Sequence, residues 1–393
     1  MTATTSATFS GFALPDELRE VAGLVERFVR ERIRPAEDAG DPAARELPEE
    51  VLAPLRTEAK SLGLWCFDTP ERYGGAGLSA FETVVVLEQA AKHRFCFPHA
   101  GGGAFGHPPP VVVFRGTEEQ IDRFARPAVA QGFRTFTAIA EPSGGTDPKR
   151  AIRTTAVRTG DTYVLNGRKQ WITNAERARY GIVYARAEGG ITAFLVDGDA
   201  EGLSTTTIPV LRDHWPTEMV LENVVVPVGN RIGEEGAGLT LAGDWLVRQR
   251  LSYAARALGI AEESVRLGIE WLQQRETFGV PLATRQSAQF DLAHARVAID
   301  AGRWLTWDAA WTDDTGGDAR TKAAMAKLHC TEAAFTIVDR MMQWFGALGM
   351  AKEMPLEHWF RDLRVARVVE GSSEILQVQI ARQMLGPAAR GGG

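Results

Sequence analysis

The sequence predicts a mainly α-helical protein with a central β domain, because the spacing of its apolar residues changes twice along the chain. Apolar residues recur at helical spacing from residue 15, in short alternating runs from about residue 136, and at helical spacing again after Gly243. We therefore expect an N-terminal helical domain over 1–135, an antiparallel β barrel or sandwich over 136–242 and a helical bundle over 243–393. A chain of 393 residues is long enough for two to three domains.

The N-terminal part is expected to form helices joined by loops rich in glycine and proline. A first helix begins at Pro15 and should break near Pro35, and a second covers 48–62. A third covers 79–91, with Ser79 as its cap. Thr117 and Gln120 have the spacing of a capping box, which predicts a short helix there.

The middle part carries pairs of short strands. Residues 154–167 and 180–198 each have the pattern of two strands joined by a tight turn, and 202–210 and 218–227 add further strands. After Gly243, three apolar stripes at helical spacing predict long helices. We interpret the tryptophans of the second helix, Trp304, Trp307 and Trp311, as core or subunit packing rather than a ligand site. The stripes comprise Leu251, Ala254, Leu258, Ala261, Val265 and Leu272; Phe290, Val297, Trp304 and Trp311; and Phe335, Val338, Met342 and Phe345.

Composition excludes several classes of protein. The chain is 45% hydrophobic and 24% charged with a net charge of −6, and it has no block of Lys and Arg such as nucleic-acid or anionic-membrane binders carry. No stretch approaches the roughly 18 apolar residues of a membrane span. Three cysteines without C-x-x-C spacing, an N-terminus without a targeting pattern and an excess of Arg over Lys favour a cytoplasmic protein of bacterial origin.

Several common types of site are also unsupported. His93, His99 and His107 lack the spacing of metal ligands, so we expect no metal site. No Walker loop, Rossmann glycine motif or nucleophile elbow is present. The segments AEPSGGTD (140–147) and QWIT (170–173) are more distinctive. By themselves they are compatible with a tight turn and ordinary strand packing, or with a wall for a planar ligand that has polar edges.

These segments and four others resemble the acyl-CoA dehydrogenase family over nearly the whole chain. The other matching segments are PERYGGAGLS (70–79), RETFGVPLATRQSAQF (275–290), QWFGALGM (343–350) and RDLRVARVVEGSSEI (361–375). The resemblance implies an N-terminal helical domain, a middle β domain, a C-terminal four-helix bundle and non-covalently bound FAD. It also implies a homodimer or a homotetramer built as a dimer of dimers, with each FAD shared between two subunits.

The resemblance assigns roles to residues by motif position. The flavin ring would contact the β domain and the start of the last helix, and the ADP part of FAD would bind at the end of the bundle across the subunit interface. The first set is Thr137, Ile139, Ala140, Trp171, Ile172, Thr173, Ser372 and Glu374, and the second is Arg275, Phe278, Leu282, Gln286, Gln343, Gly346 and Ala347. An arginine at 275 suits a pyrophosphate, although the residues alone, without the resemblance, favour an ordinary surface arginine.

Glu370 is the expected catalytic base. It lies 27 residues after Gln343, which matches the family's spacing between a flavin-contact glutamine and the base. The chemistry requires such a group, because a carboxylate must remove the weakly acidic proton next to a thioester carbonyl. Some family members carry the base at the position of Gln249, and glutamine cannot act as one. The resemblance also assigns Thr146, Arg250 and Gly371 to the substrate. Without it, Glu370 could instead be a carboxylate satisfied by helix-terminal amides.

The implied activity is oxidation of an acyl-CoA thioester in fatty acid metabolism, with electrons passed to an electron-transfer flavoprotein. A flavoprotein oxidase or monooxygenase on the same fold, and a dehydrogenase of carrier-protein thioesters, are alternatives. Ala140 stands where a hydroxyl residue is usual, which loses a hydrogen bond worth about 1 kcal/mol. A DNA-associated superfamily member is a remote alternative, because 331–393 holds seven Lys/Arg against seven Asp/Glu.

Overall fold

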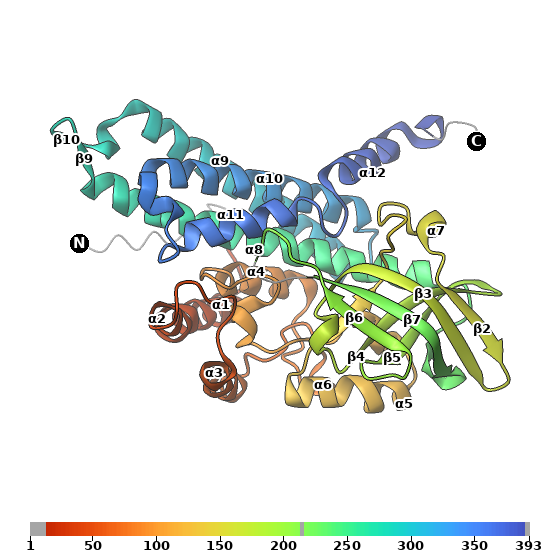
Figure 1. The fold of residues 1–393 in the computed structure, drawn as a ribbon. Helices are drawn as coiled ribbons and strands as arrows, with labels where there is room; N and C mark the ends of the chain where they lie inside the picture. Colours follow the sequence, from red (N-terminus) through yellow and green to blue (C-terminus); the bar gives the residue numbers. More distant parts are fainter. Residues whose placement is uncertain (1–12, 213–215, 390–393) are drawn as a thin grey trace.

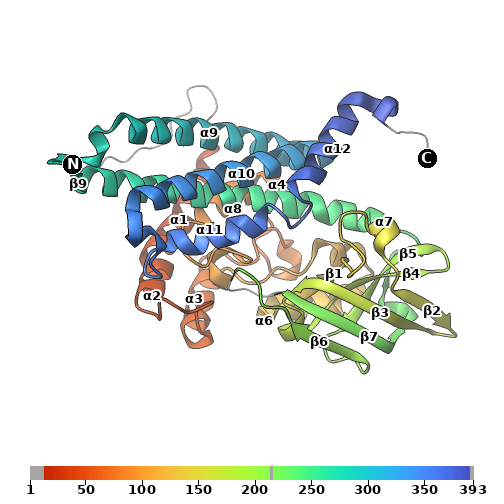
Figure 2. The same ribbon diagram turned by 45° about the horizontal axis from the view of Figure 1, so that its top comes forward.

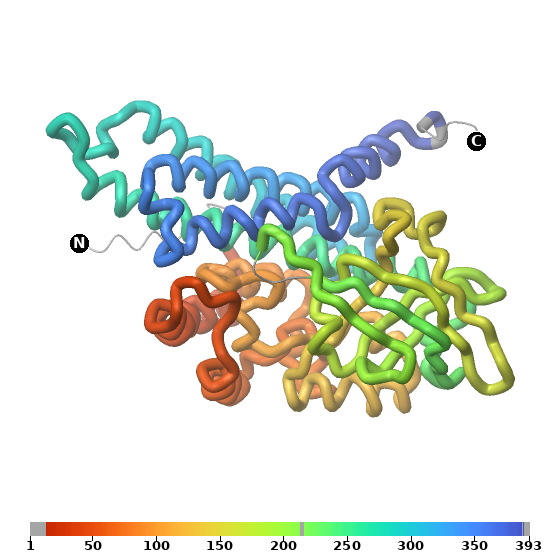
Figure 3. The backbone as a smooth tube through the Cα atoms, in the orientation of Figure 1, coloured from red at the N-terminus to blue at the C-terminus, as the bar shows by residue number. Residues whose placement is uncertain are grey.

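The computed structural model describes residues 13–212 and 216–389 and divides them into three regions. The N-terminal helices and the β domain lie side by side, and the long C-terminal helices cross above both (Figures 1 and 2). The tube view shows the C-terminal helix extending away from the rest of the bundle (Figure 3). The predicted architecture of helical domain, β domain and helical bundle is confirmed.

The described part of the N-terminal region, from residue 13 on, contains the α-helices α1 (Asp16–Phe28), α2 (Arg34–Asp38), α3 (Glu49–Ser61), α4 (Ala80–Ala90), α5 (Glu118–Gln120) and α6 (Arg126–Gln131). The predicted caps are both present. Ser79 accepts from the Glu82 amide and Thr117 from the Gln120 amide, and each capping box is reciprocal. These caps explain why α4 and α5 begin where they do.

The predicted break near Pro35 is wrong. A π-helical turn over Val29–Ile33 joins α1 to α2, so the helix continues through the proline to Asp38. The Arg34 amide donates to the carbonyl of Val29, five residues back. This wider turn accommodates the proline, which lacks an amide proton and would clash with the carbonyl of an ordinary turn. The same arrangement precedes Pro127, where a π turn over Ile121–Ala125 joins α5 to α6.

The β domain is one mixed sheet in the order β6-β7-β3-β2-β4-β5-β8, with β1 paired to β4. Its strands are β1 (Thr135–Ala138), β2 (Thr155–Thr159), β3 (Thr162–Thr173), β4 (Tyr180–Ala187), β5 (Gly190–Asp197), β6 (Leu203–Thr207), β7 (Pro216–Pro227) and β8 (Arg231–Ile232). The expectation of purely antiparallel strands is therefore corrected. β1 runs parallel to β4, and β2 meets β4 in parallel at one residue pair.

Strand β4 is buried on both faces, which explains its nearly continuous apolar sequence. Tyr180, Ile182 and Tyr184 face a core that the region of α5 and α6 completes. Val183 and Ala185 face the interior of the β domain. The sheet is thus held against the N-terminal region.

The C-terminal bundle is built from α8 (Gly238–Gln274), α9 (Gln286–Asp314), α10 (Arg320–Phe345) and α11 (Pro355–Ala366), followed by α12 (Ser373–Leu385). α10 packs against α8, α9, α11 and α12. A short hairpin of β9 (Glu276–Thr277) and β10 (Val280–Pro281) joins α8 to α9 at one tip of the molecule (Figure 1). Between β1 and β2 lies the single turn α7 (Pro148–Ala151). No helix among residues 13–212 and 216–389 meets the length and apolarity of a membrane span.

The aromatic stripe of α9 is not part of the core of this chain. Phe290, Val297, Trp304 and Trp311 are 54%, 69%, 38% and 60% exposed, whereas Leu251, Ala254 and Leu258 of the α8 stripe are buried. Of the two interpretations allowed by the sequence, packing inside the chain is therefore wrong for these four side chains. It is confirmed for Trp307 on the same helix, which is 8% exposed and belongs to the core. The four exposed side chains form a row of large apolar groups facing outward.

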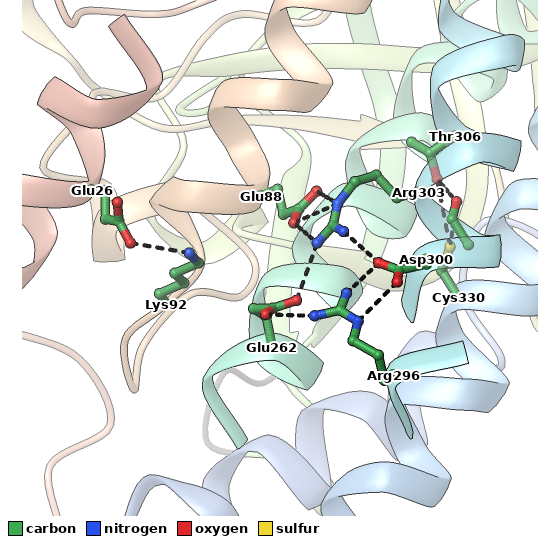
Figure 4. Close-up of polar contacts among 10 residues, drawn as sticks. Glu26, Glu88, Lys92, Glu262, Arg296, Asp300, Arg303, Thr306 and Cys330 are labelled. Carbon is green, nitrogen blue, oxygen red and sulfur yellow. Dashed lines mark hydrogen bonds and ion pairs between the residues drawn. The ribbon is translucent and has the colours of Figure 1, made fainter. Parts of the chain in front are cut away.

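A buried charge network connects the N-terminal region to the bundle (Figure 4). Arg303 of α9 donates to both carboxylate oxygens of Glu88 in α4, with a shortest distance of 2.6 Å, and to Glu262 of α8 at 3.1 Å. Asp300 accepts from it at 2.9 Å. The side chains of Arg303 and Glu88 are only 7% and 5% exposed, so the cost of burying each charge is offset mainly by the other.

Candidate active site

A cavity of about 1010 Å³ lies where the β domain, the N-terminal region and the bundle meet. Its wall is formed by β1, the end of β3, α4, α8 and the segment before α12. Many of the predicted site residues line it, although they come from five separated stretches of sequence. These are Thr137, Ile139, Ala140, Thr146, Trp171, Ile172, Thr173, Arg250, Glu370, Gly371 and Ser372.

A second set of predicted residues lies away from this cavity, at the tip of the bundle that bears the β9–β10 hairpin (Figure 1). The ends of α8 and α10 meet there, since the Trp271 indole donates to the Trp344 carbonyl at 2.9 Å. Phe278 is 97% exposed. The set comprises Arg275, Phe278, Leu282, Gln286, Gln343, Gly346 and Ala347, and Glu374 also lies outside the cavity wall, exposed in the first turn of α12.

The β-domain wall offers both backbone and ring surface. β1 pairs with β4, and no other strand of the described residues pairs with it. Thr135, Phe136 and Thr137 of β1 line the cavity. Trp171 has a positive φ of 65° and is 53% exposed. Such a wall can receive a flat ring and offer hydrogen bonds to its polar edge.

A buried ion pair supports this wall from behind. Lys169 is fully buried and donates to Glu141 at 2.8 Å, to the Tyr184 carbonyl at 2.6 Å and to the Ile139 carbonyl at 3.3 Å. Glu141 also accepts from the Thr154 hydroxyl at 2.6 Å. Burial lowers the pKa of Lys169 to about 8, against the opposing effect of Glu141. The pair fixes the segment that carries Ile139 and Ala140.

Glu370 projects into the cavity from an unusual backbone. Its φ is 56° and that of Gly371 is 98°, so two consecutive residues are left-handed just before α12 begins. No described residue donates a hydrogen bond to its carboxylate. The alternative that helix-terminal amides satisfy this group is therefore not what the structure shows.

Burial and the surrounding cations have opposite effects on the pKa of Glu370. Burial raises the pKa of Glu370 to about 7, while Lys327, Arg250, Arg256 and Arg212 act to lower it. A carboxylate with such a pKa can take up and release a proton near neutral pH. Arg250 does not form an ordinary ion pair: it donates to the Glu370 carbonyl at 3.1 Å and to Gln379 at 2.9 Å.

Comparisons with known proteins identify the family to which the chain belongs. Family models match residues 15–132 (acyl-CoA dehydrogenase, N-terminal domain), 137–224 (acyl-CoA dehydrogenase, middle domain) and 236–385 (acyl-CoA dehydrogenase, C-terminal domain). This chain belongs to the acyl-CoA dehydrogenase family.

Relatives and solved structures agree. The cyclohexane-1-carbonyl-CoA dehydrogenase of Geobacter metallireducens is 35% identical, covering 96% of this chain and 100% of that protein. The mitochondrial short-chain specific acyl-CoA dehydrogenase of Rattus norvegicus is 34% identical, covering 88% and 86%. A glutaryl-CoA dehydrogenase from Mycobacterium smegmatis, solved with FADH2, superimposes with a TM-score of 0.84 at 27% identity and covers 96% and 97%.

Membership of the acyl-CoA dehydrogenase family makes this chain an FAD-dependent oxidoreductase acting on CH–CH donors. The residues present fit a flavin. The open edge of β1 can bond a pyrimidine edge, and the exposed Trp171 can cover a ring. Ala140 lines the cavity and offers no side-chain hydrogen bond there.

Sequence reasoning missed several polar residues of this acyl-CoA dehydrogenase site. Arg212 and Arg256 are buried and line the cavity, Lys169 and Glu141 lie behind its wall, and Lys327 lies beside Glu370's loop. Lys169 alone left a signal, because it follows Tyr163 and Leu165 on the inward face of a strand, where a lysine needs a partner. The others come together only through the packing of separate helices.

Proposed function

We propose that this protein oxidises an acyl-CoA thioester to the trans-2-enoyl-CoA, with Glu370 as the catalytic base. The observation that carries the proposal is a carboxylate that lines the cavity, receives no hydrogen bond from a described residue and has a pKa near 7. When bound, FAD accepts the β-hydrogen of the substrate as a hydride. The α-proton passes to Glu370, so the two hydrogens and the electron pair are accounted for.

The chain would do three further things for this reaction. Glu370 is half-buried in the cavity wall, and a bound substrate would exclude bulk water from it, which would keep the carboxylate basic enough to remove a weakly acidic proton. The Glu370 amide would donate to the thioester carbonyl and stabilise the enolate charge. Thr146, Arg250 and Gly371 lie on the cavity wall, where the thioester and its CoA portion would bind.

An anaerobic screen tests the proposal. FAD-loaded protein is mixed with saturated acyl-CoA thioesters, including short straight-chain and cyclohexane-1-carbonyl forms, and loss of flavin absorbance is followed. We expect at least one thioester to bleach the flavin with formation of an enoyl-CoA. Bleaching by none of them, or only by the same acyl groups on a carrier protein, contradicts an acyl-CoA substrate.

The electron acceptor needs a separate measurement. We propose that the reduced flavin is reoxidised by an electron-transfer flavoprotein. Turnover in air with little peroxide, accelerated by added electron-transfer flavoprotein, is the expected result. Peroxide formed in proportion to enoyl product would instead identify an oxidase.

We also propose that FAD binds across two copies of the chain, in a homodimer or homotetramer. The residues assigned to the ADP part lie at the bundle tip, outside the cavity that holds the residues assigned to the flavin ring. An almost fully exposed Phe278 and the outward apolar row of α9 are surfaces that a second copy and its FAD would cover.

Phe278→Ser tests this arrangement. Loss of an aromatic contact to the ADP part should weaken FAD binding by about 1–3 kcal/mol, roughly 5- to 150-fold in the dissociation constant. Equilibrium dialysis of FAD measures the change. Val225→Ser, at a 59% exposed site on β7, is the control and should bind FAD normally. Unchanged FAD affinity in Phe278→Ser would argue against the shared site.

A further inference from the structure

The segment that carries Glu370 is held to α10 along its whole length. Arg367, at its start, pairs with Glu332 of α10 at 2.8 Å, and the hydroxyl of Ser373, at its end, donates to the same Glu332. Between them, Lys327 of α10 donates to the Gly371 carbonyl at 2.9 Å. One helix therefore contacts the beginning, middle and end of the segment.

Two buried cations hold consecutive carbonyls of this segment. Arg250 of α8 donates to the Glu370 carbonyl, and Lys327 donates to the next one. The carbonyls belong to the two residues with positive φ, a conformation that costs energy at Glu370 because it is not a glycine. A Cβ at position 371 would lie 3.2 Å from the Arg250 guanidinium, so the cation also packs closely against the turn.

Lys327 is itself an unusual residue. It is fully buried in α10, where an ammonium group is energetically costly unless it is paired, and among the described residues it donates only to the Gly371 carbonyl. No carboxylate of the described residues lies within ion-pair distance of it. A buried lysine with a carbonyl as its contact needs a nearby negative charge to remain protonated, and the charge that acts on it most strongly is that of Glu370.

We propose that Lys327 is a positioning residue for the base: its ammonium group holds the left-handed turn at Gly371 and keeps the Glu370 carboxylate ionised near neutral pH. The proposal rests on the proposed function for the role of Glu370. It assigns to the interior of α10 the task of holding the Gly371 carbonyl, next to the Glu370 carbonyl that Arg250 of α8 holds.

The charges around the two groups agree with this role. Lys327 is the strongest of the cations that lower the pKa of Glu370; Arg250 and Arg256 act from α8, and Arg212 from the segment before β7. Tyr253 of α8 also faces Glu370. Burial lowers the pKa of Lys327 to about 8, Arg250 and Arg367 lower it further, and Glu370 and Glu332 raise it. Lys327 thus stays mainly protonated at the pH where Glu370 ionises.

The test measures the ionisation of Glu370 directly in FAD-loaded protein. The infrared band of its protonated carboxyl group is identified as the band that Glu370→Gln removes, and its midpoint is followed with pH. Lys327→Met should raise that midpoint by about one unit or more, because a nearby opposite charge is lost. Lys327→Arg should restore it towards the wild-type value.

Two further variants keep the test decisive. Lys327→Gln retains a donor for the Gly371 carbonyl while losing the charge, so it should also raise the midpoint and serves if the methionine variant does not fold. Lys322→Met makes the same change at a more exposed lysine of α10, which pairs with Asp308, and should leave the midpoint unchanged.

The outcomes separate the two proposals. An unchanged midpoint in folded Lys327→Met and Lys327→Gln overturns the role of Lys327. If no thioester bleaches the wild-type flavin, the proposed function fails, yet the infrared titration still decides the positioning role. Where bleaching does occur, its pH profile in Lys327→Met should move upward with the midpoint, whereas a purely structural lysine would lower stability without moving the profile.

Discussion

Glu370→Gln is expected to lower the rate of flavin bleaching by substrate at least about 10³-fold while FAD and fold are retained. The amide keeps the size of the side chain but cannot accept the α-proton. Glu188→Gln, in the exposed β4–β5 turn, is the matched control and should bleach at the wild-type rate. Stopped-flow absorbance under anaerobic conditions measures both. Undiminished bleaching in Glu370→Gln would mean that another group removes the proton.

The pH dependence of the wild type follows from the same residue. The base must be ionised, so the bleaching rate should rise with pH through about 7, the pKa of Glu370. A rate that falls with pH over this range would indicate a group that must be protonated instead.

Glu370 should also make the free energy of unfolding fall as pH rises towards and above 7. Its folded-state pKa of about 7 lies above the ordinary value of 4.5, so the folded state binds the proton more tightly than the unfolded chain. The stabilisation that the folded state gains by binding this proton is fully present below pH 4.5 and is lost as pH rises through about 7. Relative to Glu370→Gln, the wild type should therefore lose unfolding free energy over that interval, as urea denaturation at several pH values would measure.

Arg303→Met is expected to lower the free energy of unfolding by about 3–5 kcal/mol, because it leaves the buried carboxylate of Glu88 without its main partner (Figure 4). Glu262 also loses a contact, although Arg296 continues to donate to it at 3.0 Å. Urea denaturation followed by tryptophan fluorescence measures the loss. Because the network joins α4 to α8 and α9, we expect the protein to release its flavin at the same urea concentration at which it unfolds.

Two further variants test the cause. Adding Glu88→Gln to Arg303→Met removes the uncompensated charge and should recover a substantial part of the lost stability. Arg320→Met breaks an exposed pair with Asp318 and should cost no more than about 1 kcal/mol. Equal losses in Arg303→Met and Arg320→Met would show that burial of the network contributes little.

Much of the fold could be predicted because it is encoded locally. The change from helical to alternating spacing near residue 136 reflects which faces of each element are buried, and the capping boxes at Ser79 and Thr117 involve residues only three apart. The prediction of a break at Pro35 was wrong because a π turn over Val29–Ile33 removes the steric conflict that a proline normally creates in a helix.

The site was predictable only in part. Motif resemblance nominated Glu370, Trp171 and Thr173, and the structure brings all three to one cavity. In a regular strand, Trp171 and Thr173 would lie on the same side because side chains alternate between the two faces. The positive φ of Trp171 and the register shift between Lys169 and Ile172 show that the strand is irregular there.

The order of helices and strands, the helix caps and the family motifs follow from the sequence, because each depends on residues close together in the chain. Only the tertiary structure decided the surroundings of Glu370 and the outward direction of the α9 aromatic row. Lys327 and Gly371 are 44 residues apart, and Arg250 and Glu370 are 120 apart. Such contacts arise when helices pack, and the pKa of a buried carboxylate depends on the charges and solvent that this packing places around it.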